Sequence, residues 1–195
     1  MLIYDLDGDG LNDIITSKNA HGYGLVWFKQ LGGGDGGEVA FEEHLIMGET
    51  LEENDYGVAF SQLHALALVD IDGDGVDDIV TGKRFWAHSD HDPGSLDPAV
   101  LYWFQTVRDD GDVRFIPHLI DNDSGVGTQV AVGDANADGL ADVLVSNKKG
   151  TYLFVQQTEP VSVATLRATQ PRPQQRLIDA GAEKLAKLIG GVAPV

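Results

Sequence analysis

The residues best suited to chemistry are aspartates that recur in three short loops. The loops share the pattern Asp-x-Asp/Asn-x-Asp-Gly-x-x-Asp and begin at Asp5, Asp70 and Asp134. A backbone that curls at the glycine would bring the oxygen side chains of positions 1, 3, 5 and 9 around one point. Calcium takes about six to eight oxygen ligands in flexible geometry, whereas magnesium needs a tighter octahedron. The pattern therefore predicts three calcium sites.

Each predicted site combines four side chains with the backbone carbonyl of position 7. The first set is Asp5, Asp7, Asp9, Leu11 and Asp13. The second set is Asp70, Asp72, Asp74, Val76 and Asp78. The third set is Asp134, Asn136, Asp138, Leu140 and Asp142. Because Asn136 carries no charge, we expect the third site to bind calcium more weakly than the other two. We also expect calcium to stabilise the fold, since the carboxylates of an ion-free loop would repel one another.

An EF-hand does not explain these loops. That motif needs a glutamate at about its twelfth position, where this chain has Thr16, Thr81 and Val145. Apolar residues come just before those positions and favour a strand over an exiting helix. Chance Asp-Gly turns are a poor explanation too, because the same oxygen pattern occurs in register three times.

The loops are evenly spaced, since their first residues are 65 and 64 positions apart. An apolar segment precedes each loop and another follows it. An aromatic segment comes next (24–28 and 100–104), and then a Phe-x-x-His segment (41–46 and 115–120). Apolar alternation between Gly and Asp turns predicts strands, and four strands per repeat is typical of a propeller blade. We therefore predict an all-β fold, a partial β-propeller of roughly two to three four-stranded blades with calcium-binding loops.

The repeats divide the chain into three parts. Residues 1–155 are predicted to form the blades, the first of which would lack most of its innermost strand. Residues 156–175 are polar and contain prolines, which indicates a linker. Residues 176–190 have the composition of a short helix. Because a propeller closes with about four to eight blades, we expect an open arc that needs missing blades or another chain to complete it.

The charge of the chain limits its partners. There are 31 acidic residues against 13 lysines and arginines, which gives a formal net charge of −18. Such a chain would be repelled by nucleic acid and by anionic membranes, and it would attract cations. No apolar run is long enough to span a bilayer. The absence of cysteine excludes disulfides and thiolate metal sites.

The three loops and the apolar pairs that follow them resemble the FG-GAP or VCBS-type repeats of β-propellers, including those of integrin α-subunits. The resemblance covers residues 1 to 155 and implies calcium bound between strands of each blade. It also implies a structural module, or one that binds a protein or a glycan, within a larger extracellular or periplasmic protein. The third copy departs from the pattern at Asn136 and Ala137.

Unrepeated polar residues suggest a second kind of site. His64, Lys83, Arg84, His88 and Gln129 precede or follow predicted strands at one end of the blades, so they are candidates for a shared polar pocket. Their segments faintly resemble the propeller part of aldos-2-ulose dehydratases. That likeness implies a lyase in which a histidine abstracts a proton beside a carbonyl and Lys83 or Arg84 stabilises the enolate. The alternative is ordinary solvent-exposed loop residues, and we favour a non-enzymatic module.

The other histidines carry weaker signals. His88-x-x-His91 with Asp90 or Asp92 is a candidate transition-metal motif, although two histidines at this spacing are a common pattern. His44 and His118 occupy equivalent positions in two repeats, which favours a structural role for both.

Overall fold

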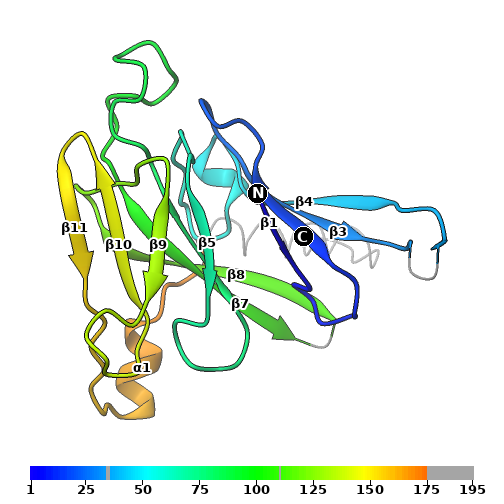
Figure 1. Ribbon diagram of the computed structural model, residues 1–195. Coiled ribbons are helices and arrows are strands. Elements are labelled where there is room, and N and C mark those ends of the chain that lie inside the picture. Colours follow the sequence, from blue (N-terminus) through cyan, green and yellow to red (C-terminus); the bar gives the residue numbers. More distant parts are fainter. Residues whose placement is uncertain (34–35, 110, 175–195) are drawn as a thin grey trace, which may run out of the picture.

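The computed structural model describes residues 1–33, 36–109 and 111–174 and shows three antiparallel sheets side by side in an arc (Figure 1). The first sheet contains β1 (Leu2–Tyr4), β2 (Asp13–Ser17), β3 (Leu25–Gln30) and β4 (Phe41–Met47). The second contains β5 (Leu66–Val69), β6 (Asp78–Gly82), β7 (Leu101–Asp109) and β8 (Asp112–Asp121). The third contains β9 (Val130–Gly133), β10 (Asp142–Asn147) and β11 (Gly150–Phe154). The predicted all-β partial propeller is confirmed.

The strand order within each sheet follows the chain, as the hairpin pattern of the repeats predicts. One expectation about the first blade is wrong, because its innermost strand is present. Strand β1 has 3 residues, against 4 in β5 and in β9, and pairs with β2 through Leu2↔Ile15 and Tyr4↔Asp13. The four residues before Asp5 therefore suffice to complete a four-stranded blade.

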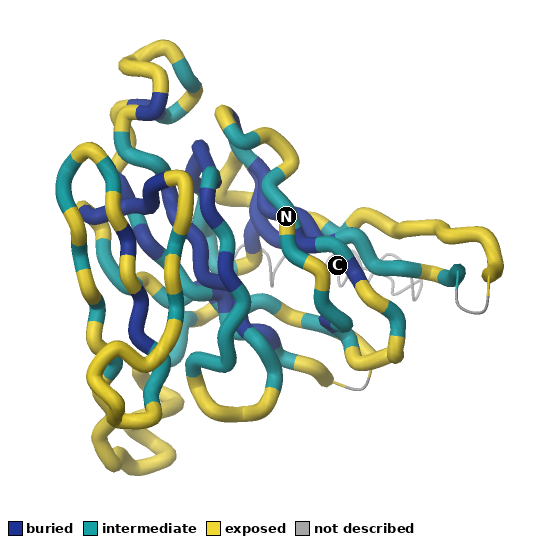
Figure 2. The backbone as a smooth tube through the Cα atoms, viewed as in Figure 1, coloured by how far each residue is buried: buried dark blue, intermediate teal, exposed yellow. Residues whose placement is uncertain are grey.

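Apolar side chains between neighbouring sheets form two cores. One lies between the first and second sheets and includes Ile15, Trp27, Leu63 and Phe104. The other lies between the second and third sheets. It contains Ala65, Ala67, Val80, Leu101, Val126, Val143 and Val145. Successive side chains of a strand point to opposite faces of its sheet. Apolar side chains on one face can therefore pack against the neighbouring sheet. Figure 2 shows the buried backbone concentrated in the middle of the arc.

The sheets do not close into a ring, and the two end sheets keep apolar residues exposed. In the first sheet Ile3 is 69% exposed and Leu45 is 45% exposed. In the third sheet Leu144 is 42% exposed and Leu153 is 51% exposed. A closed propeller would cover these faces with further blades, so the described residues form an incomplete one.

The tail contains the short helix α1 (Val163–Thr169), which lies inside the segment expected to be a linker. Ser162 caps it, since its side-chain oxygen accepts a hydrogen bond from the backbone N–H of Thr165 at 3.1 Å. A single 3-10 turn, η2 (Leu51–Glu53), interrupts the connection between the first two sheets. The helix predicted at 176–190 lies outside the described residues. Among the residues that are described, no helix has the length and apolar character needed to cross a membrane.

Candidate functional site

The three acidic loops lie at the same end of the three sheets, each joining the first strand to the second (Figure 1). They share a backbone shape, because equivalent residues have positive φ angles. Gly8 and Gly73 have φ of 79° and 78°, and the equivalent Ala137 has φ of 64°. A left-handed conformation costs a non-glycine residue about 1–2 kcal/mol. The third loop therefore keeps the shape of the others under strain.

The aspartates at positions 1 and 9 have different structural roles in each loop. The aspartate at position 1 holds the turn together by accepting hydrogen bonds from backbone amides within the loop. Asp5 accepts from the N–H groups of Gly8 and Gly10 at 2.8 and 3.0 Å. Asp70 makes the equivalent contacts to Gly73 and Gly75 at 2.7 and 2.9 Å. The carboxylates of the loop therefore hold its backbone in a turn through hydrogen bonds within the loop.

The aspartate at position 9 is buried and ties the loop to the rest of its sheet. In the second sheet, Asp78 accepts hydrogen bonds from the N–H of Ile71 at 3.1 Å and the N–H of Thr106 at 2.8 Å. Asp13 and Asp142 repeat this arrangement on their own strands. We call these three residues the clamp aspartates. The sequence pattern predicts them as metal ligands, whereas their structural role is visible only in the fold.

Carboxylate oxygens gather closely at the first two loops. The groups are Asp5, Asp7 and Asp9 in the first loop and Asp70, Asp72 and Asp78 in the second, with one oxygen from each residue within 4.8 Å of the others. Burial, together with the charges of Asp72 and Asp74, raises the pKa of Asp78 to about 7, although its hydrogen bonds act against the shift. A cation among these oxygens would offset that repulsion, and the all-oxygen donor set suits calcium. At the third loop, the amide of Asn136 donates a hydrogen bond to Asp138 at 2.9 Å.

The first and second loops differ in one neighbour from the third strand of their sheets. Lys29 contacts both Asp7 and Asp9, and its ammonium lies 3.3 Å from Asp9. The hydrogen bond to Asp7 raises the pKa of Lys29, although burial acts against the shift. At the equivalent position of the second sheet, the neutral Gln105 donates a hydrogen bond to Asp72. The Lys29 ammonium already neutralises part of the carboxylate charge of the first loop. A cation would therefore gain less electrostatic stabilisation there than in the second loop.

The unrepeated polar residues lie at the opposite end of the sheets. His64 and Gln129 line one open cavity of about 470 Å³ with Met1 and Thr128, where the innermost strands β5 and β9 begin. Burial lowers the pKa of His64, and the charge of Arg84 and the neighbouring His21 and His88 lower it further. The structure thus places His64 beside Gln129 and within electrostatic reach of Arg84.

Lys83 does not join that cavity. Its side chain is fully buried, its Nζ donates a hydrogen bond to the carbonyl of Ser95 at 3.3 Å, and burial lowers its pKa. Its backbone contacts the connection between the second and third sheets, since the N–H of Val126 donates to the carbonyl of Lys83 at 3.1 Å. The position of Lys83 along the chain could not show that its side chain is buried, whereas the charge of the adjacent Arg84 acts on His64.

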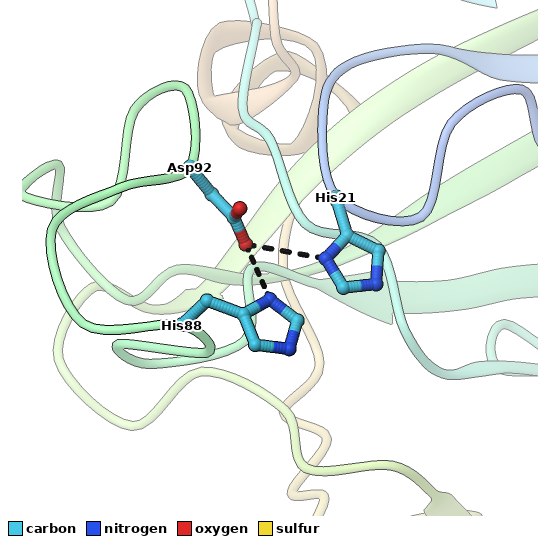
Figure 3. A group of neighbouring side chains, drawn as sticks. All are labelled: His21, His88 and Asp92. Atoms are coloured by element: carbon cyan, nitrogen blue, oxygen red, sulfur yellow. Dashed lines mark hydrogen bonds and ion pairs between the residues drawn. The ribbon is translucent and has the colours of Figure 1, made fainter.

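The sequence spacing suggests that His88 pairs with His91, whereas the structure brings His88 together with His21. His88 contacts Asp92, and the second histidine on Asp92 is His21 from the first sheet (Figure 3). His91 lies 3.4 Å from Asp90 and is outside this group. Of the predicted motif, the contact between His88 and Asp92 is present, whereas the pairing of His88 with His91 is not. No sequence signal identified His21, because it is 67 residues before His88.

The repeated histidines pack on tryptophans. His44 stacks on Trp27 with 4.6 Å between ring centroids, and His118 stacks on Trp103 with 4.3 Å. Both pairs lie directly across neighbouring strands of their sheets. This geometry agrees with the structural role that their repetition suggests.

A comparison with known protein families finds an FG-GAP repeat over residues 126–163. That segment contains the whole third sheet and the third acidic loop. A search of curated proteins finds no match to the chain. The FG-GAP repeat and the three side-by-side sheets define a propeller-type structural or binding module.

Proposed function

We propose that the chain is a calcium-binding propeller module in which the ions hold the acidic loops in shape. The observation that carries the proposal is the second loop, where Asp70, Asp72 and Asp78 bring three carboxylate oxygens within 4.8 Å of one another. Its neighbour Gln105 is neutral, whereas Lys29 places an ammonium against the carboxylates of the first loop. Bound calcium supplies positive charge to these oxygens.

The protein's own residues would do the positioning. The position 1 aspartates already curl the backbone, and the clamp aspartates fix each loop to the third strand of its sheet. The carbonyls of Leu11, Val76 and Leu140 are the proposed backbone ligands. A loop held in this way contributes to the stability of the blade, because an ion that binds only the folded state shifts the folding equilibrium.

Calorimetric titration with Ca²⁺, and separately with Mg²⁺, tests this function. We expect calcium to bind, and Asp72→Asn to remove the site of highest affinity. Asp90→Asn is the matched control, because Asp90 is an exposed aspartate in a loop at the other end of the sheets. Absence of calcium binding by the wild-type protein, or equal losses in the two variants, would refute the proposal.

The module is proposed to act within a larger extracellular or periplasmic protein that binds a protein or a glycan. The exposed apolar faces of the end sheets support the need for further blades or another chain. Light scattering on the isolated chain gives a direct test. We expect self-association, since uncovered sheet faces and edges invite pairing. A monodisperse monomer of 20.9 kDa with one cooperative unfolding transition would show that the chain needs no partner.

A second candidate function is a lyase acting on sugar-derived ketones, and His64 is the observation that favours it. Its lowered pKa favours the neutral imidazole, and its Nε2 is buried without a hydrogen-bond partner. His64 would abstract a proton beside the carbonyl, and Arg84 would stabilise the enolate. The test is an assay with an anhydro-ketose for an unsaturated product, comparing His64→Ala with the control His91→Ala. No turnover by the wild-type chain, or equal turnover by both variants, would remove this candidate.

A further inference from the structure

Three side chains from two different sheets converge at the end of the molecule opposite the acidic loops. His21 lies in the connection between β2 and β3 of the first sheet. His88 and Asp92 lie in the long connection between β6 and β7 of the second. Figure 3 shows the Nδ1 atoms of both imidazoles directed at the same carboxylate oxygen.

The distances suit a metal ion. Asp92 Oδ2 lies 2.8 Å from His88 Nδ1 and 3.3 Å from His21 Nδ1, and all three donor atoms lie within 4.8 Å of one another. Ligand atoms bound tetrahedrally at the usual zinc distances are roughly 3.3 Å apart. The donor atoms are therefore close enough to surround one ion once one of the two stacked imidazoles turns toward it.

We propose that His21, His88 and Asp92 form a binding site for a divalent transition-metal ion, with zinc as the best fit. Two imidazole nitrogens and one carboxylate oxygen are a donor set that zinc accepts, with a fourth position left for water or a ligand. Calcium prefers oxygen ligands alone, so this site and the acidic loops would select different ions. The proposal does not depend on calcium binding.

Backbone hydrogen bonds hold the two connections in place. The N–H of Gln62 donates to the carbonyl of Gly22 at 2.7 Å, which fixes the first connection beside His21. The carbonyl of Gln62 accepts from the N–H of Arg84 at 3.0 Å, which fixes the start of the second connection. One buried residue thus anchors both segments of the site. Such preorganisation lowers the entropic cost of ordering the ligand side chains when a metal ion binds.

The loop around His88 is also strained. Trp86 and Ser89 have φ angles of 45° and 62°, which are unfavourable for residues with a side chain. Strained backbone conformations tend to occur at binding sites, where the surrounding structure maintains them. Here the positive φ angles lie on both sides of His88 in the sequence.

The two imidazole rings face each other with 4.3 Å between centroids and an interplanar angle of 8°. The in-plane lone pairs of parallel rings do not converge, so one imidazole turns when both nitrogens bind the same ion. The side chains of His21 and His88 are half exposed, at 48% and 51%, which leaves access for an ion and for an outer ligand.

The site has no equivalent in the third sheet. There the second and third strands are joined by a tight turn that begins at Asn147 and ends at Gly150, with Lys148 and Lys149 between them. A structural feature of the repeat would occur in every blade. The metal would instead link the first blade to the second and present its open position to solvent at that end of the module.

Calorimetric titration with Zn²⁺ in excess Ca²⁺ tests the proposal, because calcium then occupies the acidic loops. We expect one zinc ion per wild-type chain and a loss of affinity of about tenfold or more in His21→Ala, His88→Ala and Asp92→Asn. The matched control is His91→Ala, which removes a histidine of the same connection and should leave zinc binding unchanged. Melting curves in calcium show whether each variant is folded.

Co²⁺ gives an independent readout, since its visible absorption bands intensify when it is bound tetrahedrally. We expect those bands in the wild type and in His91→Ala, and their loss in His21→Ala. The proposal is overturned if the wild type binds no zinc, if His91→Ala weakens binding as much as His21→Ala, or if His21→Ala leaves binding unchanged.

Discussion

The two ends of the sheets differ in what is repeated. At one end the loops 5–12, 70–77 and 134–141 share length, backbone shape and aspartate positions. At the other end the connections 18–24, 83–100 and 148–149 differ in length and in residue type. Features that are repeated in every blade serve the folding of each blade. Features that occur in one connection alone are candidates for a specific function. The acidic end is therefore the structural end, and the histidine end holds the candidate for specific recognition.

The hydrogen bonds explain this division. At the acidic end, carboxylates accept from buried backbone amides, as Asp78 does from Ile71 and Thr106. At the histidine end, two exposed imidazoles, those of His21 and His88, contact the partly buried carboxylate of Asp92. Loss of a buried acceptor destabilises the fold, whereas loss of an exposed contact changes mainly what the surface can bind.

The largest effect that separates the two ends is expected from Asp78→Ala. It leaves two backbone N–H groups without acceptors, and each such group costs about 1–3 kcal/mol. Urea unfolding in calcium should therefore show a free energy of unfolding lower by roughly 2–5 kcal/mol. His88→Ala should change it by about 0.5 kcal/mol or less. Equal destabilisation by the two substitutions would remove the distinction between the ends.

A somewhat smaller difference is expected among the acidic loops themselves. Asp72→Ala removes a charged oxygen from the second loop, whereas Asn136→Ala removes a neutral one from the third. A site filled at a hundredfold excess over its Kd stabilises the fold by about 2.7 kcal/mol. The calcium-dependent rise in melting temperature should therefore shrink more in Asp72→Ala than in Asn136→Ala. The reverse ranking would contradict our account of the third loop.

The pH dependence without calcium should be weaker still, but it has a definite sign. The folded-state pKa of Asp78 is raised to about 7 by burial, above the usual value of 3.8. The folded protein thus binds this proton more tightly than the unfolded chain. Its contribution to stability is fully present below about pH 4 and is lost as the pH rises through about 7. Melting curves in chelator between these pH values should show this decline, and calcium should reduce it. A decline that persists in Asp78→Asn would assign it to another group.

The smallest effect should come from Lys29→Gln, which gives the first loop the neutral neighbour that the second loop has in Gln105. Without the ammonium beside Asp7 and Asp9, the first loop should gain calcium affinity, by about tenfold or less. Lys18→Gln is the matched control, because Lys18 pairs with Glu43 away from the loop. Calcium calorimetry on both variants measures the change. Unchanged affinity in Lys29→Gln would show that the lysine does not compete.

The sequence predicted the blades and the acidic loops well, because their information is local and is repeated three times. It did not predict the second role of Asp78, since the amide of Thr106 that it binds is 28 residues away. His21 was missed for the same reason, because it meets Asp92 only when two sheets pack together. Lys83 was predicted in the pocket because it follows a strand at the same end of the blade as His64, although its side chain is buried in the interior.

The most direct measurement is the melting temperature of the whole chain by calorimetry, in calcium and in chelator. We expect a higher melting temperature in calcium, because ions held by the acidic loops would stabilise only the folded blades. We also expect magnesium at the same concentration to give a smaller rise. Identical melting curves in calcium and in chelator would contradict the claim that the repeated loops are structural calcium sites.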